Sequence, residues 1–312
     1  AIRDARQLGL PKMLLLGVQH MFAMFGATIL VPIIASSAYG LPLNIQTTLF
    51  FAGVGTLFFH LCSKLKVPAF LGSSFAFLGG FETMSKMDQG IYAGMSPADK
   101  LAYACGGIVV AGLLYLVLAL LVKVVGVRKV MRFLPPVVTG PIIICIGLNL
   151  APSAVSNAAQ CWPLALIALA VIIVFNIWGK GMFKIIPILL GVVISYIAAA
   201  IMNACGMVNA DGSAILNFAS IAEAGWLGLP PVQIAKFDLS AILVMAPIAI
   251  AAMMEHIGDM SAISATVGSN FMEDPGLHRT LIGDGLATTL SAMFGGPANT
   301  TYGENTGVLV LS

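Results

Sequence analysis

Long apolar runs recur along the whole chain, each close to the roughly 20 residues that a helix needs to cross the hydrocarbon core of a bilayer. The chain is 59% hydrophobic and only 9% charged, whereas soluble domains carry roughly 25% charged residues. A soluble core can bury a few such runs but not a whole series of them. The sequence therefore predicts an all-α polytopic membrane protein, and its net charge of +2 gives no reason to expect a nucleic-acid partner.

We expect about ten crossings of the membrane, most as continuous helices and two as interrupted segments. The interrupted segments are 68–84 and 299–312, where glycine and polar residues break the apolar pattern. The continuous spans are predicted at 12–36, 45–63, 101–123, 133–152, 162–178, 183–204, 239–258 and 279–296. Because the chain begins at Ala1 and stops within an apolar run at Ser312, we expect it to be a fragment of a longer protein.

Lys and Arg residues are unevenly distributed over the predicted loops. Cytoplasmic loops of membrane proteins carry an excess of these residues. With the N-terminus inside, only Lys86, Lys100 and Lys236 fall on the outer side. The inner side then receives Arg3, Arg6, Lys12, Lys64, Lys66, Lys123, Arg128, Lys129, Arg132, Lys180, Lys184 and Arg279. The sequence therefore predicts a cytoplasmic N-terminus.

The two interrupted segments have matching sequences. Ser73-Ser74-Phe75 and Thr300-Thr301-Tyr302 each place two hydroxyl residues before an aromatic residue, 227 positions apart. The same offset relates the start of the first span to the start of the span at 239. Seven crossings per repeat is an odd number, so the second repeat would be inverted, as in many transporters. We expect a first repeat at 1–204, an extracellular or periplasmic loop at 205–237 and a truncated second repeat at 238–312.

Glu304 lies inside the second interrupted segment, directly after Gly303. Irregular backbone survives at membrane depth only where it is buried in protein or lines a wet cavity, and an ionisable residue there is a candidate functional group. Glycine allows backbone N–H groups to approach a ligand closely. The alternative is that Glu304 caps the start of a helix. Two interrupted segments at corresponding positions of two repeats predict the binding site of a transporter.

Glu255 and Asp259 are a second candidate group, at the end of a long apolar run. A spacing of four residues places both carboxylates on one helical face, whereas His256 points about 100° away. Two acids one turn apart repel when both are ionised, which favours protonation of one of them. The pair therefore has the chemistry of a proton carrier. For Asp259 the alternative remains open that it has reached the membrane interface and is simply solvated.

Phe75 and Tyr302 occupy matching positions and would be able to hold a flat ring between them. A lone aromatic residue in a span more often serves packing, but the correspondence between the two segments favours the ring-binding role. Asp284, between Gly283 and Gly285, is a further acid within a predicted span. The sequence leaves both a supporting role and an interfacial position open for it.

The cysteine and histidine residues form no metal-binding pattern. No nucleophile motif or zinc-protease motif accompanies the acids. An intramembrane enzyme using Glu255 and Asp259 as acid and base would need one. We therefore expect no metal, no cofactor and no enzymatic activity.

Several long motifs resemble the nucleobase–ascorbate transporter family. The family's signature, an acidic or amide residue followed by Asn-x-Gly, is present as Glu304-Asn305-Thr306-Gly307. The other matching stretches are 19–28, 71–77, 255–258, 274–279 and 299–303, and the resemblance covers nearly the whole chain. It implies about fourteen spans in two inverted repeats, a core and a gate domain, and short antiparallel strands in spans three and ten.

The resemblance also implies roles for individual residues. Glu255 and Glu304 would accept hydrogen bonds from a nucleobase, and backbone groups at Phe75 and Gly303 would meet its carbonyl edge. The implied substrate-binding residues are Glu255, Glu304, Phe75, Gly303, Tyr302, Ala27 and Ser74. The implied proton-coupling residues are Glu255, Asp259 and Glu304. Uracil transporters of the family carry a histidine where this chain has Asp259, a titratable residue that is able to replace it.

The function implied is secondary active import of uracil with protons across the bacterial inner membrane, by alternating access. Glutamate rather than glutamine at 304 is typical of the pyrimidine branch. The partners expected are uracil or a related nucleobase, protons, the lipid bilayer and a second copy in a homodimer. Two alternatives remain, a xanthine or purine permease of the same family and an anion transporter with the same fold. A site for an anion would be expected to contain Lys or Arg, yet neither residue type occurs in the interrupted segments 68–84 and 299–312.

Overall fold

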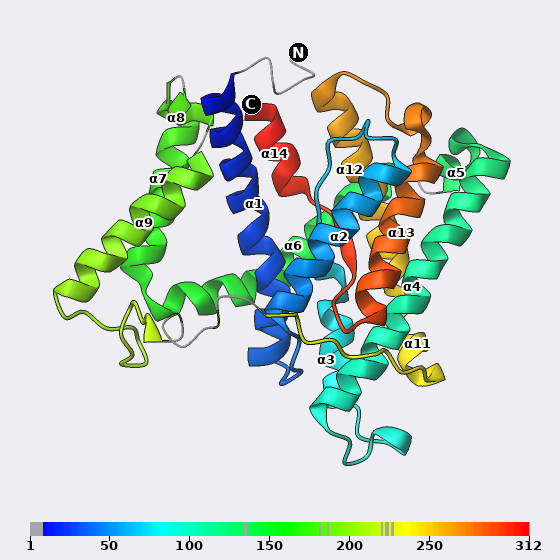
Figure 1. The fold of residues 1–312 in the computed structure, drawn as a ribbon, viewed down its shortest axis with the longest axis horizontal. Coiled ribbons are helices and arrows are strands. Elements are labelled where there is room, and N and C mark those ends of the chain that lie inside the picture. The colour runs from blue at the N-terminus through cyan, green and yellow to red at the C-terminus, as the bar shows by residue number, and fades with distance from the viewer. Residues whose placement is uncertain are drawn as a thin grey trace. The chain divides into compact units, whose positions relative to one another are not determined.

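The computed structural model describes residues 9–133, 136–180, 182–185, 187–219, 221, 225 and 228–311. The chain is mostly helical (Figure 1) and forms two compact units. The smaller unit comprises Ala1–Ala23, Gly147–Leu229 and Gly307–Ser312, and the larger unit comprises Met24–Ile146 and Pro230–Thr306. Three helices contribute to both units, namely α1 (Leu10–Ser37), α6 (Pro136–Gln160) and α14 (Gly303–Leu311).

Most predicted spans are present as helices within a few residues of their expected bounds. Six helical stretches in the described part of the chain are long and apolar enough to cross a membrane. The basic residues Arg3 and Arg6, used to predict orientation, lie outside the described residues. The helices of the larger unit, besides its parts of α1, α6 and α14, are α2 (Ile45–Cys62), α3 (Leu78–Lys86), α4 (Pro97–Val125), α5 (Val127–Phe133), α11 (Leu239–Met245), α12 (Ile248–Val267) and α13 (Leu277–Met293).

The span predicted at 239–258 differs from the structure. It is divided into α11 and α12 at Ala246-Pro247, and α12 continues nine residues beyond the predicted end, to Val267. A proline removes a backbone donor and disturbs the preceding turn of a helix. Gly268, in the left-handed conformation with φ of 69°, ends α12, which is a common helix stop. The acids predicted near the end of a span therefore lie well inside a helix.

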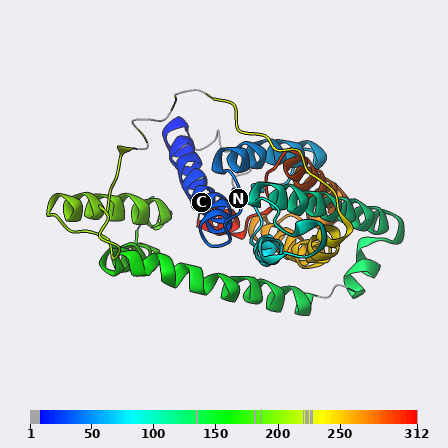
Figure 2. The same ribbon diagram turned by 90° about the horizontal axis from the view of Figure 1, so that it is seen from below.

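Helices α2, α4 and α13 pack side by side in the larger unit, as Figures 1 and 2 both show. Glycines make this approach close. A Cβ on Gly285 of α13 would lie 2.6 Å from Tyr115 Cβ and 2.8 Å from Gly112 O, both on α4. A Cβ on Gly283 would lie 2.9 Å from Phe59 Cα of α2. Small residues at helix contacts are the usual means of close packing in membranes.

A two-stranded antiparallel ribbon joins the interrupted segments. Strand β1 (Leu71–Ser73) pairs with β2 (Asn299–Thr301), with Leu71 opposite Thr301. Two further bonds extend the pairing, from Ser74 N to Ala298 O at 2.8 Å and from Tyr302 N to Phe70 O at 3.1 Å. The short antiparallel strands expected in these segments are therefore present. A short helical turn at Phe75–Phe77 leads from β1 into α3, and α14 begins directly after β2.

An extended segment closes one end of the larger unit. Backbone N–H groups of Gln233, Ala235 and Lys236 donate to carbonyl oxygens at the C-terminal end of α13 and on α4, at 2.9 to 3.3 Å. Lys236 O passes so close to Gly106 of α4 that no side chain fits there. This segment is part of the loop expected at 205–237, and its hydrogen bonds link α4 to the C-terminal end of α13.

The smaller unit contains α7 (Trp162–Trp178), α8 (Met182–Ile185) and α9 (Pro187–Ala204). Helices α7 and α9 pack together, and a Cβ on Gly191 of α9 would lie 2.6 Å from Ile172 Cγ1. After α9 a tight turn is held by a bridge between Val208 and Ala214. Its Ala210 N donates to Gln160 O at 2.8 Å, which fixes the turn to the end of α6.

Candidate functional site

The ribbon is fixed to the helices by a buried asparagine. Asn299 Nδ2 donates to Phe51 O of α2 at 3.1 Å and to Ala287 O of α13 at 3.4 Å. Its backbone is held from the same side, because Thr288 Oγ1 of α13 donates to Asn299 O at 2.8 Å. A buried amide that bonds to the backbone of two helices sets the position of the strand that carries it. The strand therefore has a defined depth in the larger unit.

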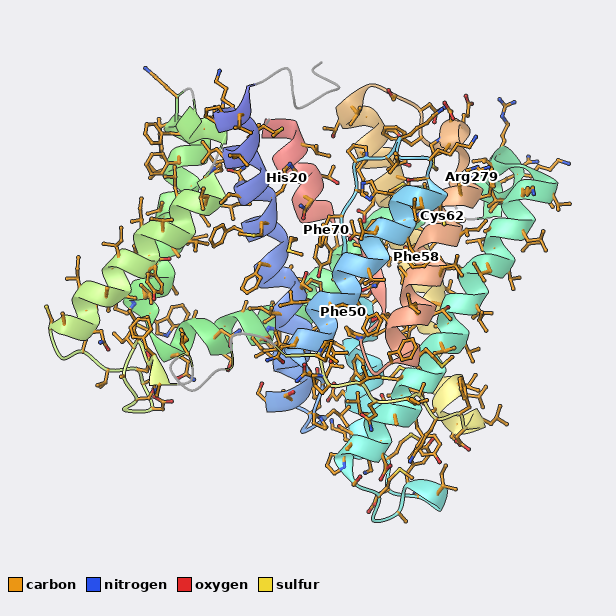
Figure 3. The ribbon with its side chains drawn as sticks, in the orientation of Figure 1. His20, Phe50, Phe58, Cys62, Phe70 and Arg279 are labelled. Carbon is orange, nitrogen blue, oxygen red and sulfur yellow. The ribbon has the colours of Figure 1, made fainter. Side chains whose placement is uncertain are left out.

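The first strand is fixed to α1 and to Tyr302. Ser73 Oγ donates to Thr28 O of α1 at 2.8 Å, and Tyr302 Oη donates to Ser73 O at 3.1 Å. The Tyr302 ring covers Gly72 so closely that a Cβ there would overlap it. The ring also lies 6.3 Å from that of Phe70, a residue labelled in Figure 3. Tyr302 is thus buried against the ribbon.

Asp259 faces the ribbon from α12. It is buried, and its Oδ2 accepts a 2.7 Å hydrogen bond from Thr301 Oγ1. Its Oδ1 lies 3.6 Å from the position that a Cβ on Gly303 would take. Asp259 is therefore buried and not simply solvated, because α12 continues past it and a strand residue covers it. The structure brings this candidate proton-coupling residue next to a candidate binding residue.

The remaining predicted site residues lie on the same elements. Glu255 precedes Asp259 by one turn of α12 and is half-buried, as are Ala27 of α1 and Phe75. Ser74 is fully buried, and among the described residues its Oγ has no hydrogen-bond partner. The backbone of Glu304 lies in the first turn of α14, whereas its side chain lies outside what the structure describes.

A histidine–aspartate pair beside these acids was not identified from the sequence. His256 Nδ1 lies 2.8 Å from Asp284 Oδ2, and both side chains are fully buried. His256 Nε2 lies 3.0 Å from Thr280 Oγ1, which donates to Leu277 O. Asp284 is therefore in the interior and not at an interface. The glycines on either side of it were the available signal, because they mark the point where α2 and α4 approach α13 most closely.

Basic residues gather where α2 ends and α13 begins. Lys66 forms an exposed ion pair with Asp274, and Arg279 Nη1 donates to Cys62 O at 3.4 Å. Figure 3 shows Arg279 and Cys62 close together, away from the ribbon. The Lys66 ammonium holds the pKa of Asp274 below its ordinary value. No group of side chains in the described part of the chain has the composition of a metal site.

Comparisons with known proteins agree on one class. The profile of the Permease family that covers xanthine and uracil permeases matches residues 11–312. A probable uracil permease of Pasteurella multocida is 39% identical over 96% of this chain and 68% of its own length. The uracil permease of Bacillus caldolyticus is 40% identical over 95% of this chain and 66% of its own length. The uracil permease of Escherichia coli K12 is 34% identical over 95% of this chain and 65% of its own length.

A solved structure has the same fold. The transmembrane domain of a cyanobacterium bicarbonate transporter, BicA, superimposes with a TM-score of 0.53. The alignment covers 94% of this chain and 76% of that one, at 16% identity. At this identity the likeness concerns the fold alone.

Proposed function

The chain belongs to the nucleobase–ascorbate transporter family of permeases, which are transporters and not enzymes, and we propose that the protein imports uracil together with protons. It is a multi-pass membrane protein with several apolar helices. The chain spans about two thirds of the length of the curated relatives it matches. The proposal concerns the whole protein, which would have about fourteen spans in two inverted repeats.

The observation that carries the proposal is the placement of acids against the ribbon. Asp259 accepts a hydrogen bond from Thr301 in β2, and Glu255 lies one turn earlier on the same helix. Acids next to a broken helix at membrane depth are the usual elements of a proton-coupled site. The relatives named as uracil permeases support a neutral, flat pyrimidine as the substrate.

Uracil fits the chemistry of these residues. Its N–H groups are donors and its two carbonyl oxygens are acceptors, all in one plane. Carboxylates of Glu255 and Glu304 would accept from the N–H groups, and backbone N–H groups at Phe75 and Gly303 would donate to the carbonyls. Phe75 begins the short helical turn that precedes α3, and Gly303 begins α14. The first N–H groups of a helix have no partner within it, and the helix dipole there favours an ionised carboxylate. Ala27, Ser74 and Tyr302 complete the proposed site.

Protonation of Glu255 or Asp259 from the outer side would prepare the site for uracil. A neutral carboxyl next to a second acid removes their mutual repulsion, so proton and base would be bound together. Movement of the core domain past the gate domain would then open the site to the cytoplasm. The basic end formed by Lys64, Lys66 and Arg279 would face the cytoplasm of a bacterial inner membrane, with the N-terminus on the same side.

Uptake of labelled uracil by the full-length protein, in cells lacking their own uracil uptake, tests the proposal. Entry should fall when a protonophore is added and should be unaffected by unlabelled xanthine. Glu255→Gln should abolish it, whereas Glu82→Gln, an exposed acid of α3 paired with Lys86, should leave it unchanged. No uracil entry would refute the proposal, and entry abolished by xanthine would indicate a purine permease.

A further inference from the structure

The buried pair of His256 and Asp284 lies outside the proposed substrate contacts and has an unusual setting. His256 is on α12 and Asp284 on α13, and neither side chain has any exposed surface. The His256–Asp284 contact thus joins α12 to α13 through two buried polar side chains.

Charge balance requires that the pair shares a proton. An ionised carboxylate buried without a partner is costly, and so is a lone imidazolium. One proton held between Nδ1 and Oδ2 makes the pair neutral overall, whichever atom carries it. His256 is also the one basic side chain on α12, and α13 has its other basic residues, His278 and Arg279, in its first turn. The sequence around the pair offers no second cation to replace His256.

An aromatic ring and a hydroxyl group contact the imidazole of His256. The Phe59 ring of α2 lies edge-on to the imidazole, with centroids 6.3 Å apart, and Thr280 takes the other imidazole nitrogen. The titratable groups nearby are Tyr115 from α4 and, on α12 itself, Glu255 and Asp259. The Tyr115 hydroxyl is within electrostatic reach of Asp284 and of both these acids.

Contacts with two neighbouring elements set the rotation of α12. Asp259 accepts a hydrogen bond from Thr301 of the ribbon, and His256 lies 2.8 Å from Asp284 and 3.0 Å from Thr280, both on α13. Residues 256 and 259 lie about 60° apart around a helix with 3.6 residues per turn. A helix tied to two neighbours in this way cannot rotate without breaking a buried polar contact. The orientation of Glu255 therefore depends on the neighbouring His256, which is not one of the proposed substrate-binding residues.

We propose that His256 and Asp284 form a proton-sharing pair that positions Glu255 and keeps its own proton throughout transport. The transported proton is then carried by Glu255 and Asp259 and not by the histidine. This inference rests on the proposed function for its transport readout, but the shared proton itself does not depend on uracil as the substrate.

Substitutions at 256 separate the two nitrogens of the imidazole. His256→Asn places an amide donor near the position of Nδ1, toward Asp284. His256→Gln places one near Nε2, toward Thr280, and leaves the aspartate without its partner. Breaking one side of a buried charged pair is strongly destabilising. We expect His256→Gln to raise the KM for uracil about 100-fold and His256→Asn less than about tenfold.

A double substitution tests whether the carboxylate is the cause. Adding Asp284→Asn to His256→Gln removes the unpartnered charge and should restore the KM by at least about tenfold, because an unpaired neutral amide costs less to bury than an unpaired carboxylate. The pH profile of uptake in the double variant should match that of the unaltered protein. Failure of this rescue, or loss of the pH dependence, would overturn the proposal. Folded protein is quantified for each variant by size-exclusion chromatography, and the comparison is made per folded molecule.

The shared proton can be tested by a spectroscopic measurement that does not depend on transport. In protein labelled with ¹⁵N-histidine, the signal that disappears in His256→Asn belongs to His256. We expect this signal to show an Nδ1 that shares a proton in a hydrogen bond, and we expect Asp284→Asn to change it. An Nδ1 signal that is the same in Asp284→Asn would refute the pair. If the signal is as expected but uracil is not transported, the pair stands and the substrate assignment fails.

Discussion

The contact between α4 and α13 at Gly285 should not tolerate a methyl group. A Cβ there would lie 2.6 Å from Tyr115 Cβ and 2.8 Å from Gly112 O, whereas ordinary contacts begin at 3.4 Å. The shortfall of about 0.8 Å involves a backbone oxygen and an atom next to the backbone, which side-chain rotation cannot relieve. The two helices would have to separate, or α13 would have to shift along α4.

The size of the effect follows from two opposing terms. Alanine is favoured over glycine in a helix by roughly 1 kcal/mol. Overpacking of a well-packed contact typically costs about 1–3 kcal/mol, occasionally more. We expect Gly285→Ala to destabilise the folded protein by up to about 2 kcal/mol. Because Asp284 is the preceding residue, the shift of α13 should also disturb its contact with His256 and reduce uracil uptake.

The assay is thermal unfolding of the purified full-length protein in detergent, together with uptake in cells. Gly53→Ala in α2 is the matched control, because a Cβ there meets no atom within 4 Å. The control should be neutral or slightly stabilising by its helix propensity. If Gly285→Ala has the same midpoint and uptake as Gly53→Ala, the close approach of α4 and α13 is not as described.

Three further changes test other contacts. Thr301→Val removes the hydroxyl that donates to Asp259. A hydrogen bond to a charged group contributes about 1.5–3 kcal/mol, so uracil uptake should fall roughly 10- to 100-fold and its pH profile should change. Thr301→Ser keeps a hydroxyl and should retain uracil uptake. Asn299→Ala removes the amide that bonds to α2 and α13; the thermal midpoint should fall, by a cost of about 1–3 kcal/mol, and an unchanged midpoint would contradict its anchoring role. Lys66→Gln breaks an exposed ion pair with Asp274, so the midpoint at neutral pH should not change measurably. Because the pKa of Asp274 is lowered, any stabilisation from the ion pair is present at neutral pH and is lost as the pH falls through that pKa. A large decrease of the thermal midpoint at neutral pH in Lys66→Gln would show that the ion pair contributes more than its exposure indicates.

The sequence contained enough information to predict the class of fold and the position of the interrupted segments. Long apolar runs require helices in a bilayer, because only a helix satisfies its own backbone there. The motifs at 73–75 and 300–302 interrupt those runs in the same way, and the structure pairs the overlapping segments Leu71–Ser73 and Asn299–Thr301 as β1 and β2. Local composition was sufficient for the helices and the interruptions, whereas the antiparallel strands were expected only from the family resemblance.

The contacts that define the site depend on the tertiary structure. Helical spacing predicted that Glu255 and Asp259 share a face, but the end of α12 was expected nine residues too early, which left Asp259 open to a solvated interpretation. Its partner Thr301 lies 42 positions away in the chain, and no local pattern relates two residues at that distance.

The contact between His256 and Asp284 is a second case that depends on the tertiary structure. The sequence showed that His256 points away from the two acids and that glycines flank Asp284. It did not determine which helix His256 faces, because an apolar helix in a membrane has no polar side to orient it. Packing of α2 and α4 onto Gly283 and Gly285 places Asp284 where the imidazole of α12 meets it. Length, composition and local motifs thus determined which segments form long apolar helices, whereas close packing of glycine-bearing helices decided which buried polar groups meet.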